Sequence, residues 1–195
     1  YMAVVILKLY EEGSIDLDEM AGKYLPEAQS KLVPGLEKVT VRMLLNHTSG
    51  LPEYNFDPTY ITRLLQNPTR LFEPAEYLEY VKNMKPMFEA GSRYSYVNLN
   101  YVLLALIADQ VTGNHAVYMK EKIFEPLGLK HTFYRIAQGN TYGGMLVNSY
   151  WDRHGNGTIE NISVLQNSNV ASMAGDDGLI TTPEEAVLFL KGLME

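Results

Sequence analysis

The hydrophobic positions of this chain recur mostly at helical spacing. Residues 1–12, YMAVVILKLYEE, carry apolar side chains on nearly every side, as is typical of a helix that is buried on most sides. Gly13 ends this helix, whereas no Ser, Thr, Asp or Asn precedes Tyr1 to cap its start. We therefore expect a buried first helix that is cut at its N-terminal end.

Capping residues mark two further helices. Thr40 is expected to cap a helix through residues 43–45, which Gly50 ends. In the last helix Thr182 is the N-cap, the following proline occupies the first helical position, and Glu185 completes a capping box. Periodicity predicts additional helices at about 58–66, 75–84, 99–112 and 115–124.

The region 131–180 has little helical periodicity. It is rich in Gly, Asn, Tyr and Ser, which predicts loops with short strands. Neither an internal repeat nor a linker interrupts the chain. We therefore expect residues 1–195 to form a single, mainly α domain, with at most short strands in 131–180.

The amino-acid composition excludes several classes of partner and of binding site. The formal charge is −7, from 16 Lys and Arg against 23 Asp and Glu, which argues against a nucleic-acid partner. No apolar run approaches the roughly 20 residues of a transmembrane helix. The chain has no cysteine, which excludes disulfides and thiolate metal sites.

The stretch LLNHTSGLP places His47 and Ser49 two positions apart, in the manner of hydrolase residues. Residues at this spacing on a helix point to different sides and cannot form the hydrogen bond of a nucleophile with its base. The alternative is a helix C-terminus, where Gly50 takes the left-handed conformation and the polar side chains satisfy free carbonyls. We favour this structural role.

Two acidic stretches have structural and functional interpretations. WDRHGNGTIE resembles part of a calcium loop, but Ser163 stands where a bidentate glutamate is needed, and a hairpin turn at Asn156-Gly157 explains the same residues. AGDDG, 174–178, is either a carboxylate pair or a turn before a capped helix. His115 and His131 have no partners at metal-ligand spacing, so neither a metal nor a cofactor is predicted.

The stretch Tyr96-Val97-Asn98 comes directly before a long apolar helix. On physical grounds alone, Tyr96 is either a catalytic phenol or an interfacial aromatic. Asn98 is either a substrate-binding amide or a helix N-cap.

Five segments in order give these residues a context. The chain resembles the serine β-lactamase and penicillin-binding-protein-like superfamily, on its class C, D-alanyl-D-alanine carboxypeptidase and esterase side. The matching segments are ILKLYEEGSIDLDEMAGKYLP, VTVRMLLNHTSGLP, FEAGSRYSYVNLNYVLLALIADQVTG, YMKEKIFEPLGLKHTFY and GDDGLITTPEEAVLFLKGL. They cover nearly the whole chain except about 135–170. In this family the His-Thr-Ser-Gly turn is a scaffold element, and Tyr96-Val97-Asn98 matches the Tyr-x-Asn motif.

The resemblance also implies what lies outside these residues. The family's nucleophile is the serine of a Ser-x-x-Lys motif, whose lysine would lie about two residues before Tyr1. A later Lys-Thr-Gly or His-x-Gly strand would follow Glu195. We therefore expect a β-lactamase-like domain that is incomplete at both ends and comprises mainly the helical region of that α+β fold.

Tyr96 and Asn98 are expected at the edge of a cleft next to the N-terminal end of residues 1–12, with His47 and Ser49 away from it and bonded to backbone. Without the motif lysine, Tyr96 is expected to titrate near its ordinary pKa.

The implied chemistry is acyl transfer through a covalent serine ester. Tyr96, together with the motif lysine, would handle the proton of the serine hydroxyl and then that of the leaving group. Asn98 would hydrogen-bond the lysine and an amide carbonyl of the substrate. D-amino-acid peptides, β-lactams and small esters remain open as substrates, with Val97 a bulkier spacer than is usual. The alternative is a non-catalytic peptidoglycan-binding or sensing relative. A periplasmic, cell-envelope or secreted location is implied by the resemblance.

The cut first helix has a physical consequence. We expect its apolar side chains to be exposed in this chain, which at about 25 cal/mol per Å² leaves several kcal/mol of burial unrealised. The chain is therefore predicted to self-associate through residues 1–12 and, without the serine and lysine, to be inactive by itself. The side chains expected to be exposed are Tyr1, Met2, Val4, Val5, Ile6, Leu7 and Leu9.

Overall fold

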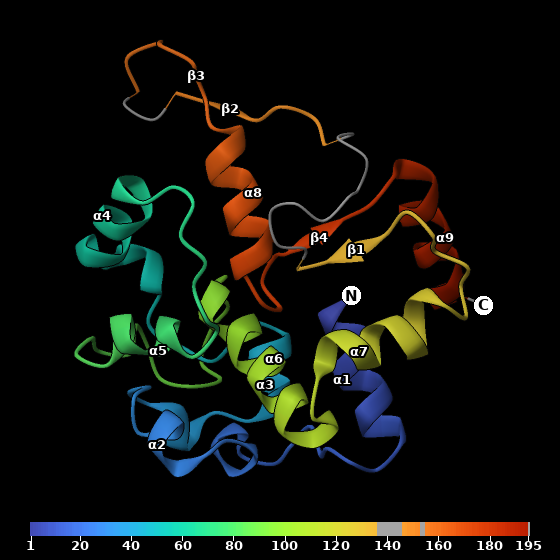
Figure 1. The fold of residues 1–195 in the computed structure, drawn as a ribbon. Coiled ribbons are helices and arrows are strands. Elements are labelled where there is room, and N and C mark those ends of the chain that lie inside the picture. The colour runs from blue at the N-terminus through green and yellow to red at the C-terminus, as the bar shows by residue number, and fades with distance from the viewer. Residues whose placement is uncertain (136–145, 153–154, 195) are drawn as a thin grey trace.

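The computed structural model describes residues 1–135, 146–152 and 155–194, which form helices packed around one long apolar helix, α6 (Figure 1). The α-helices are α1 (Met2–Glu11), α2 (Glu27–Ser30), α3 (Val41–Leu45), α4 (Pro58–Gln66), α5 (Glu76–Val81), α6 (Asn98–Thr112), α7 (His115–Met119), α8 (Ser163–Ser172) and α9 (Pro183–Met194). The 3-10 turns are η1 (Ala21–Tyr24), η2 (Leu36–Lys38) and η3 (Tyr54–Phe56), and a π-helical turn, η4 (Lys120–Phe124), continues α7. The prediction of a mainly α structure is confirmed.

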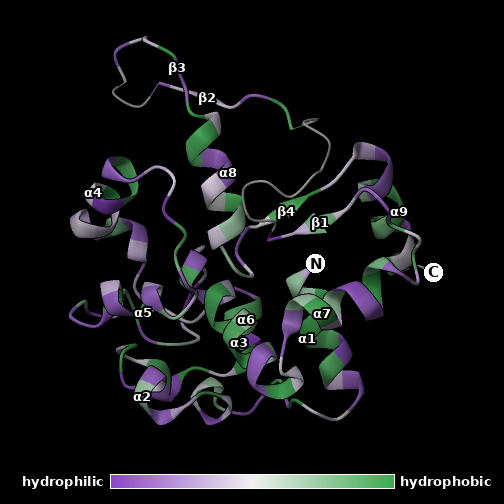
Figure 2. Ribbon diagram, in the orientation of Figure 1, coloured by the Kyte–Doolittle hydropathy of each residue, from purple (hydrophilic) through white to green (hydrophobic). Residues whose placement is uncertain are grey.

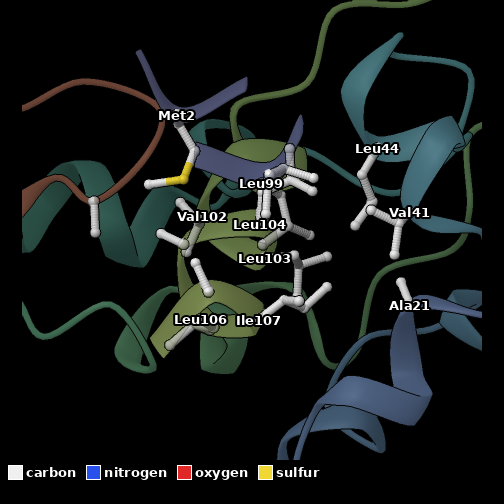
Figure 3. Close-up of a cluster of buried hydrophobic side chains, with 14 of the residues drawn as sticks. Met2, Ala21, Val41, Leu44, Leu99, Val102, Leu103, Leu104, Leu106 and Ile107 are labelled. Carbon is white, nitrogen blue, oxygen red and sulfur yellow. The ribbon is translucent and has the colours of Figure 1, made fainter. Parts of the chain in front are cut away.

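Helix α6 occupies the centre because it is hydrophobic along most of its length (Figure 2). Every residue from Leu99 to Ala108 except Tyr101 is buried, including the polar Asn100. Side chains of α1, α3 and η1 gather around it (Figure 3). A helix that is apolar all round is stable in water only when other elements enclose it.

The first helix is buried within this chain, contrary to our expectation. Met2, Val5, Ile6 and Leu9 are all buried, because α1 packs against α6 and α7. Tyr1, Val4 and Ala3 are half-buried, and Tyr1 stacks on Phe189 of α9 with ring centroids 3.7 Å apart. On α1 the large exposed apolar residues are Leu7 and Tyr10.

Two small antiparallel ladders supply the strands. β1 (Phe133–Tyr134) pairs with β4 (Leu179–Ile180), so that Tyr134 lies opposite Leu179. β2 (Tyr150–Trp151) pairs with β3 (Glu160–Asn161), so the WDRHGNGTIE stretch is a hairpin, as one of its two interpretations predicted. Its Asp152 carboxylate accepts the N–H groups of Asn156 and Gly157, whereas His154 lies outside the described residues.

Helix α8 corrects the prediction that 131–180 contains only loops and short strands. Its sequence, SVLQNSNVAS, has poor intrinsic helix propensity because Ser and Asn side chains compete for the backbone. Tertiary contacts stabilise it instead. The Ser172 hydroxyl accepts the N–H of Phe72 and donates to the carbonyl of Ser168, and Leu165 and Val170 are buried.

Candidate functional site

Tyr96 presents its phenol to solvent at the end of the segment that leads into α6. The residue is 57% exposed, so its hydroxyl is accessible to a small molecule. Its ring lies against the imidazole of His47, with centroids 4.5 Å apart and planes tilted by 35°. An exposed tyrosine that is held on one face by another ring has a defined orientation.

His47 fixes the segment that carries Tyr96. Its carbonyl accepts the N–H of Ser95 at 2.9 Å, and its Nδ1 accepts the N–H of Val97 at 3.3 Å. Because Nδ1 accepts, the ring proton lies on Nε2, and burial lowers the pKa of His47 and favours this neutral form. The imidazole ring also stacks on the ring of Tyr101, with centroids 5.1 Å apart. We expected His47 to lie away from the predicted cleft of Tyr96 and Asn98; its ring packs directly against Tyr96, where its role is structural.

Ser49 is directed into the core and is only 2% exposed. Its Oγ donates to Oδ1 of Asn100 at 2.7 Å and accepts the N–H of Leu51 at 3.2 Å. Ser49 also contributes to the wall of a cavity of about 480 Å³ that includes Lys38, but its hydroxyl is engaged by the asparagine. This geometry supports a scaffold role for the turn, because the Ser49 hydroxyl is hydrogen-bonded to an amide oxygen and to a backbone N–H.

Asn98 is the first residue of α6 and is bound by a carboxylate from another segment. Glu53, almost fully buried, accepts the backbone N–H of Asn98 at 2.6 Å and its side-chain Nδ2 at 3.1 Å. A negative charge at a helix N-terminus is favourable because free N–H groups point toward it. Asn98 is therefore not the N-cap; that position belongs to Val97. Its amide is oriented with Nδ2 toward Glu53 and Oδ1 turned from it.

Asp176, which acts electrostatically on Tyr96, was signalled by the sequence only as part of an acidic turn. Its Oδ2 accepts the hydroxyl of Tyr54 at 2.6 Å, whereas its Oδ1 is out of solvent contact and has no partner among the described residues. Burial raises the pKa of Asp176 to about 7, and the charges of Asp177 and Glu53 add to this increase.

Three carboxylates act electrostatically on the candidate phenol. Burial raises the pKa of Tyr96, and so do the negative charges of Asp176, Glu53 and Asp177. Our expectation that Tyr96 would titrate near its ordinary value is wrong, because that expectation considered only the absence of a lysine. The phenol stays protonated at neutral pH, so it can donate a proton.

A small cavity of about 230 Å³ lies at the N-terminal end of α1. It is lined by Tyr1, Met2, Met119, Tyr134, Gly175, Asp176, Asp177 and Leu179. Neither Tyr96 nor Asn98 is among the residues that line this cavity. The cleft that we expected between these two residues and the start of α1 therefore stays a prediction. The carboxylates of the 174–178 turn line the cavity and also act on Tyr96.

Among the other histidines that the structure describes, His115 has both ring nitrogens hydrogen-bonded and His131 is bound through its backbone. His115 is buried between the carboxylate of Asp109, 2.7 Å from Nδ1, and the hydroxyl of Tyr134, 2.9 Å from Nε2. The N–H of His131 is bound by Glu185. In the described ranges no group of three or more His, Cys, Asp or Glu could hold a metal ion. Nor is any helix in this part long and apolar enough to cross a membrane.

Comparison with known proteins identifies the family. The family model described as Beta-lactamase matches residues 1–192. The N-acetylmuramyl-L-alanine amidase of Bacillus subtilis (strain 168) is 29% identical over 137 residues, which are 67% of this chain and 30% of that protein. The present chain therefore matches less than a third of that relative's length.

Solved structures show the same arrangement of elements. A D-stereospecific amidohydrolase from Streptomyces sp. superimposes with a TM-score of 0.84 at 26% identity, over 99% of this chain and 57% of that one. The octameric penicillin-binding protein homologue from Pyrococcus abyssi gives a TM-score of 0.75 at 27% identity, over 97% and 42% of the two chains.

Proposed function

The chain belongs to the beta-lactamase family, an enzyme family, and we propose that it supplies the tyrosine–asparagine part of a serine hydrolase site. The proposed reaction is acyl transfer through a covalent serine ester, on D-amino-acid peptides, β-lactams or small esters. The observation that carries this proposal is the exposed, oriented phenol of Tyr96 two residues from Asn98.

Tyr96 is the proposed proton carrier. Its raised pKa keeps the phenol protonated at neutral pH, so it is suited to protonate a leaving group. To accept the proton of a serine it needs a cation nearby, because a positive charge favours the phenolate. The lysine of a Ser-x-x-Lys motif would supply that charge.

Asn98 is the proposed substrate-binding amide. One N–H of its side chain is directed to Glu53, which fixes the amide plane. The second N–H can donate to a substrate carbonyl, while Oδ1 can accept from an ammonium group. Glu53 is thus proposed to orient Asn98 without touching the substrate.

Substitution of Tyr96 tests the proposal. In the native protein, Tyr96→Phe is expected to lower kcat 10²- to 10⁴-fold on a D-alanyl dipeptide, a chromogenic cephalosporin or a p-nitrophenyl ester, because general acid–base catalysis is lost. Tyr94→Phe is the matched control, since Tyr94 is a neighbouring exposed tyrosine, and should leave the rate nearly unchanged. A native protein that hydrolyses none of these and yet binds peptidoglycan would support the non-catalytic alternative.

The 195-residue polypeptide by itself is proposed to be inactive. None of its serines is followed three residues later by a lysine, and Ser49 has its hydroxyl bound to Asn100. Its rate on the same substrates should equal that of its Tyr96→Phe variant. Turnover that Tyr96→Phe abolishes would show that a nucleophile within these residues had been missed.

Self-association through residues 1–12 is also proposed, but over a smaller surface than the sequence indicated. Leu7 and Tyr10 are the large apolar side chains that α1 exposes. The structurally similar protein from Pyrococcus abyssi is described as octameric, which is a property of that protein.

A further inference from the structure

The acidic turn at residues 174–178 is held through the backbone of Gly175. The N–H of Gly175 donates to the hydroxyl of Tyr134 at 2.8 Å. Gly175 has φ 85°, and a Cβ at this position would overlap the carbonyl oxygen of Tyr101 in α6. Only glycine combines this left-handed conformation with so close an approach to another backbone. The turn is therefore pressed against α6 on one side and bonded to Tyr134 by its N–H.

The hydroxyl of Tyr134 is itself aligned by a buried histidine. His115 is 1% exposed, with Nε2 2.9 Å from the Tyr134 hydroxyl and Nδ1 2.7 Å from Oδ1 of Asp109. Although burial opposes its ionisation, the hydrogen bonds from His115 lower the pKa of Asp109, so this group is a carboxylate at neutral pH. A carboxylate only accepts, so Nδ1 carries a proton. In the neutral imidazole Nε2 then accepts the Tyr134 O–H, which leaves the lone pairs of that oxygen for Gly175.

Two stacked rings form the spacer between this turn and the candidate phenol. Tyr101, whose carbonyl lies against Gly175, stacks on His47 with ring centroids 5.1 Å apart. His47 in turn packs against Tyr96, with centroids 4.5 Å apart. The carboxylates of the turn act across this spacer and raise the pKa of Tyr96 beyond the effect of burial. The strength of that action depends on how closely the turn is held to α6.

We propose that Tyr134, aligned by His115 and Asp109, is a positioning residue of the candidate site. Its hydroxyl holds Gly175 against α6, and the turn then keeps its two carboxylates at a fixed distance from Tyr96. This inference rests on the proposed role of Tyr96. It adds to the site three residues from α6, α7 and β1 that act through the turn.

The ionisation of Tyr96 tests the proposal without a substrate. Carbon-13 at Cζ reports each phenol by NMR, and Tyr96→Phe assigns the signal among the 14 tyrosines. Tyr134→Phe keeps the ring but removes the acceptor of Gly175. It is expected to lower the Tyr96 midpoint by about 0.5 pH unit, because carboxylates held less closely oppose the phenolate less.

Tyr118→Phe is the matched control for Tyr134→Phe. It removes a phenol hydroxyl that donates to the carboxylate of Glu12 at 2.9 Å, and it leaves the turn untouched. The Tyr96 midpoint should then stay within about 0.1 pH unit of the wild-type value. An equal shift in both variants would overturn the positioning role of Tyr134.

Two amides at position 115 test the alignment by the histidine. His115→Gln places an amide oxygen near the position of Nε2, where it can accept the Tyr134 hydroxyl, whereas His115→Asn is one methylene too short. The Tyr96 midpoint should therefore fall in His115→Asn, as in Tyr134→Phe, and should stay near the wild-type value in His115→Gln. A loss of stability alone does not move the midpoint of the folded protein. An unmoved midpoint in His115→Asn would contradict the alignment.

Removal of the charges on the turn tests the route of the effect. In the background Asp176→Asn/Asp177→Asn, Tyr134→Phe should change the Tyr96 midpoint by less than about 0.1 pH unit, because the displaced turn is then uncharged. A full shift in this background would show that Tyr134 acts on Tyr96 by another route and would overturn the inference.

The pH dependence of the reaction separates this inference from the proposed function. If Tyr96 carries the proton, the alkaline limb of the kcat/KM profile of the native protein should move with the Tyr96 midpoint in Tyr134→Phe. A lowered midpoint with an unmoved limb would support the positioning role and refute Tyr96 as the proton carrier. An unmoved midpoint in Tyr134→Phe, in a native protein that loses activity with Tyr96→Phe, would refute only the positioning role.

Discussion

At the scale of single residues, His47 carries more of the structure than its motif suggests. Its backbone lies in the left-handed region at φ 57°, which is uncommon for a residue other than glycine. From this position the ring contacts Tyr96 and accepts the N–H of Val97. One imidazole thus joins the turn after α3 to the segment of the candidate phenol.

His47→Ala is expected to destabilise the protein by about 2 kcal/mol. The Val97 N–H loses its acceptor, and alanine is strained in the left-handed conformation. His47→Asn should cost less, because asparagine tolerates that conformation, yet it lacks the ring that holds Tyr96. Urea denaturation of the three proteins measures the order. Equal stability of His47→Ala and the wild type would contradict the proposed role.

The raised pKa of Asp176 leads us to expect an unusual pH dependence of the free energy of unfolding. Its pKa is raised in the folded protein to about 7, so the folded state binds this proton more tightly than the unfolded state does. The resulting stability is fully present below about pH 4, the usual pKa of an aspartate, and is lost as the pH rises toward 7.

Asp176→Asn should therefore stabilise the protein at pH 8, by up to about 4 kcal/mol, and change stability little at pH 4. The reason is that the amide cannot ionise next to Glu53 and Asp177 and can still accept from Tyr54. Thermal unfolding at both pH values measures this. If Asp176→Asn instead lowered the stability at pH 8, the ionised Asp176 carboxylate would have to be stabilised by other groups in the folded protein.

At the scale of elements, the capping residues of the last helix, α9, have two different roles. The N–H of Glu185 donates to the Thr182 hydroxyl at 3.2 Å, so the predicted N-cap is confirmed. The Glu185 side chain, however, accepts the N–H groups of Lys130 and His131 and the hydroxyl of Thr132. Its role is to attach the segment before β1 to α9.

Glu185→Ala is expected to cost about 2 to 3 kcal/mol, because three donors lose one buried acceptor. Glu184→Ala provides the control: it lies in the same helical turn, is exposed, and should change the free energy of unfolding by less than about 0.5 kcal/mol. Chemical denaturation compares the two. Similar costs for both variants would mean that the interaction of each charge with the helix dipole dominates.

At the scale of the whole molecule, burial of α1 within the chain limits the surface for self-association. The larger set of exposed apolar side chains lies on α9 and comprises Val187, Leu188, Leu190, Leu193 and Met194. Light scattering can compare the two helices. The proposal expects Leu7→Glu to reduce the molar mass of the 195-residue chain. Dissociation by Leu190→Glu alone would contradict it and assign the contact to α9.

The sequence by itself determined much of the helical framework. The strong periodicity and the capping threonines gave helix bounds close to those observed, with 58–66 matching α4. A proline at the first helical position, or a threonine cap, acts through the adjacent backbone, so local sequence is sufficient to predict it. The resemblance to the family was likewise carried by short continuous segments of sequence, one of which contains Tyr96 and Asn98.

Only the tertiary structure decided what those residues contact. Glu53 and Asn98 are separated by 45 positions, and Tyr54 and Asp176 by 122, so no local pattern links them. Helix α8 forms from residues of poor propensity because Phe72 and the core stabilise it. Hydrogen bonds and charges act over a few ångströms of space, whatever the distance along the chain. The acidic surroundings of Tyr96 were therefore visible only in the folded molecule.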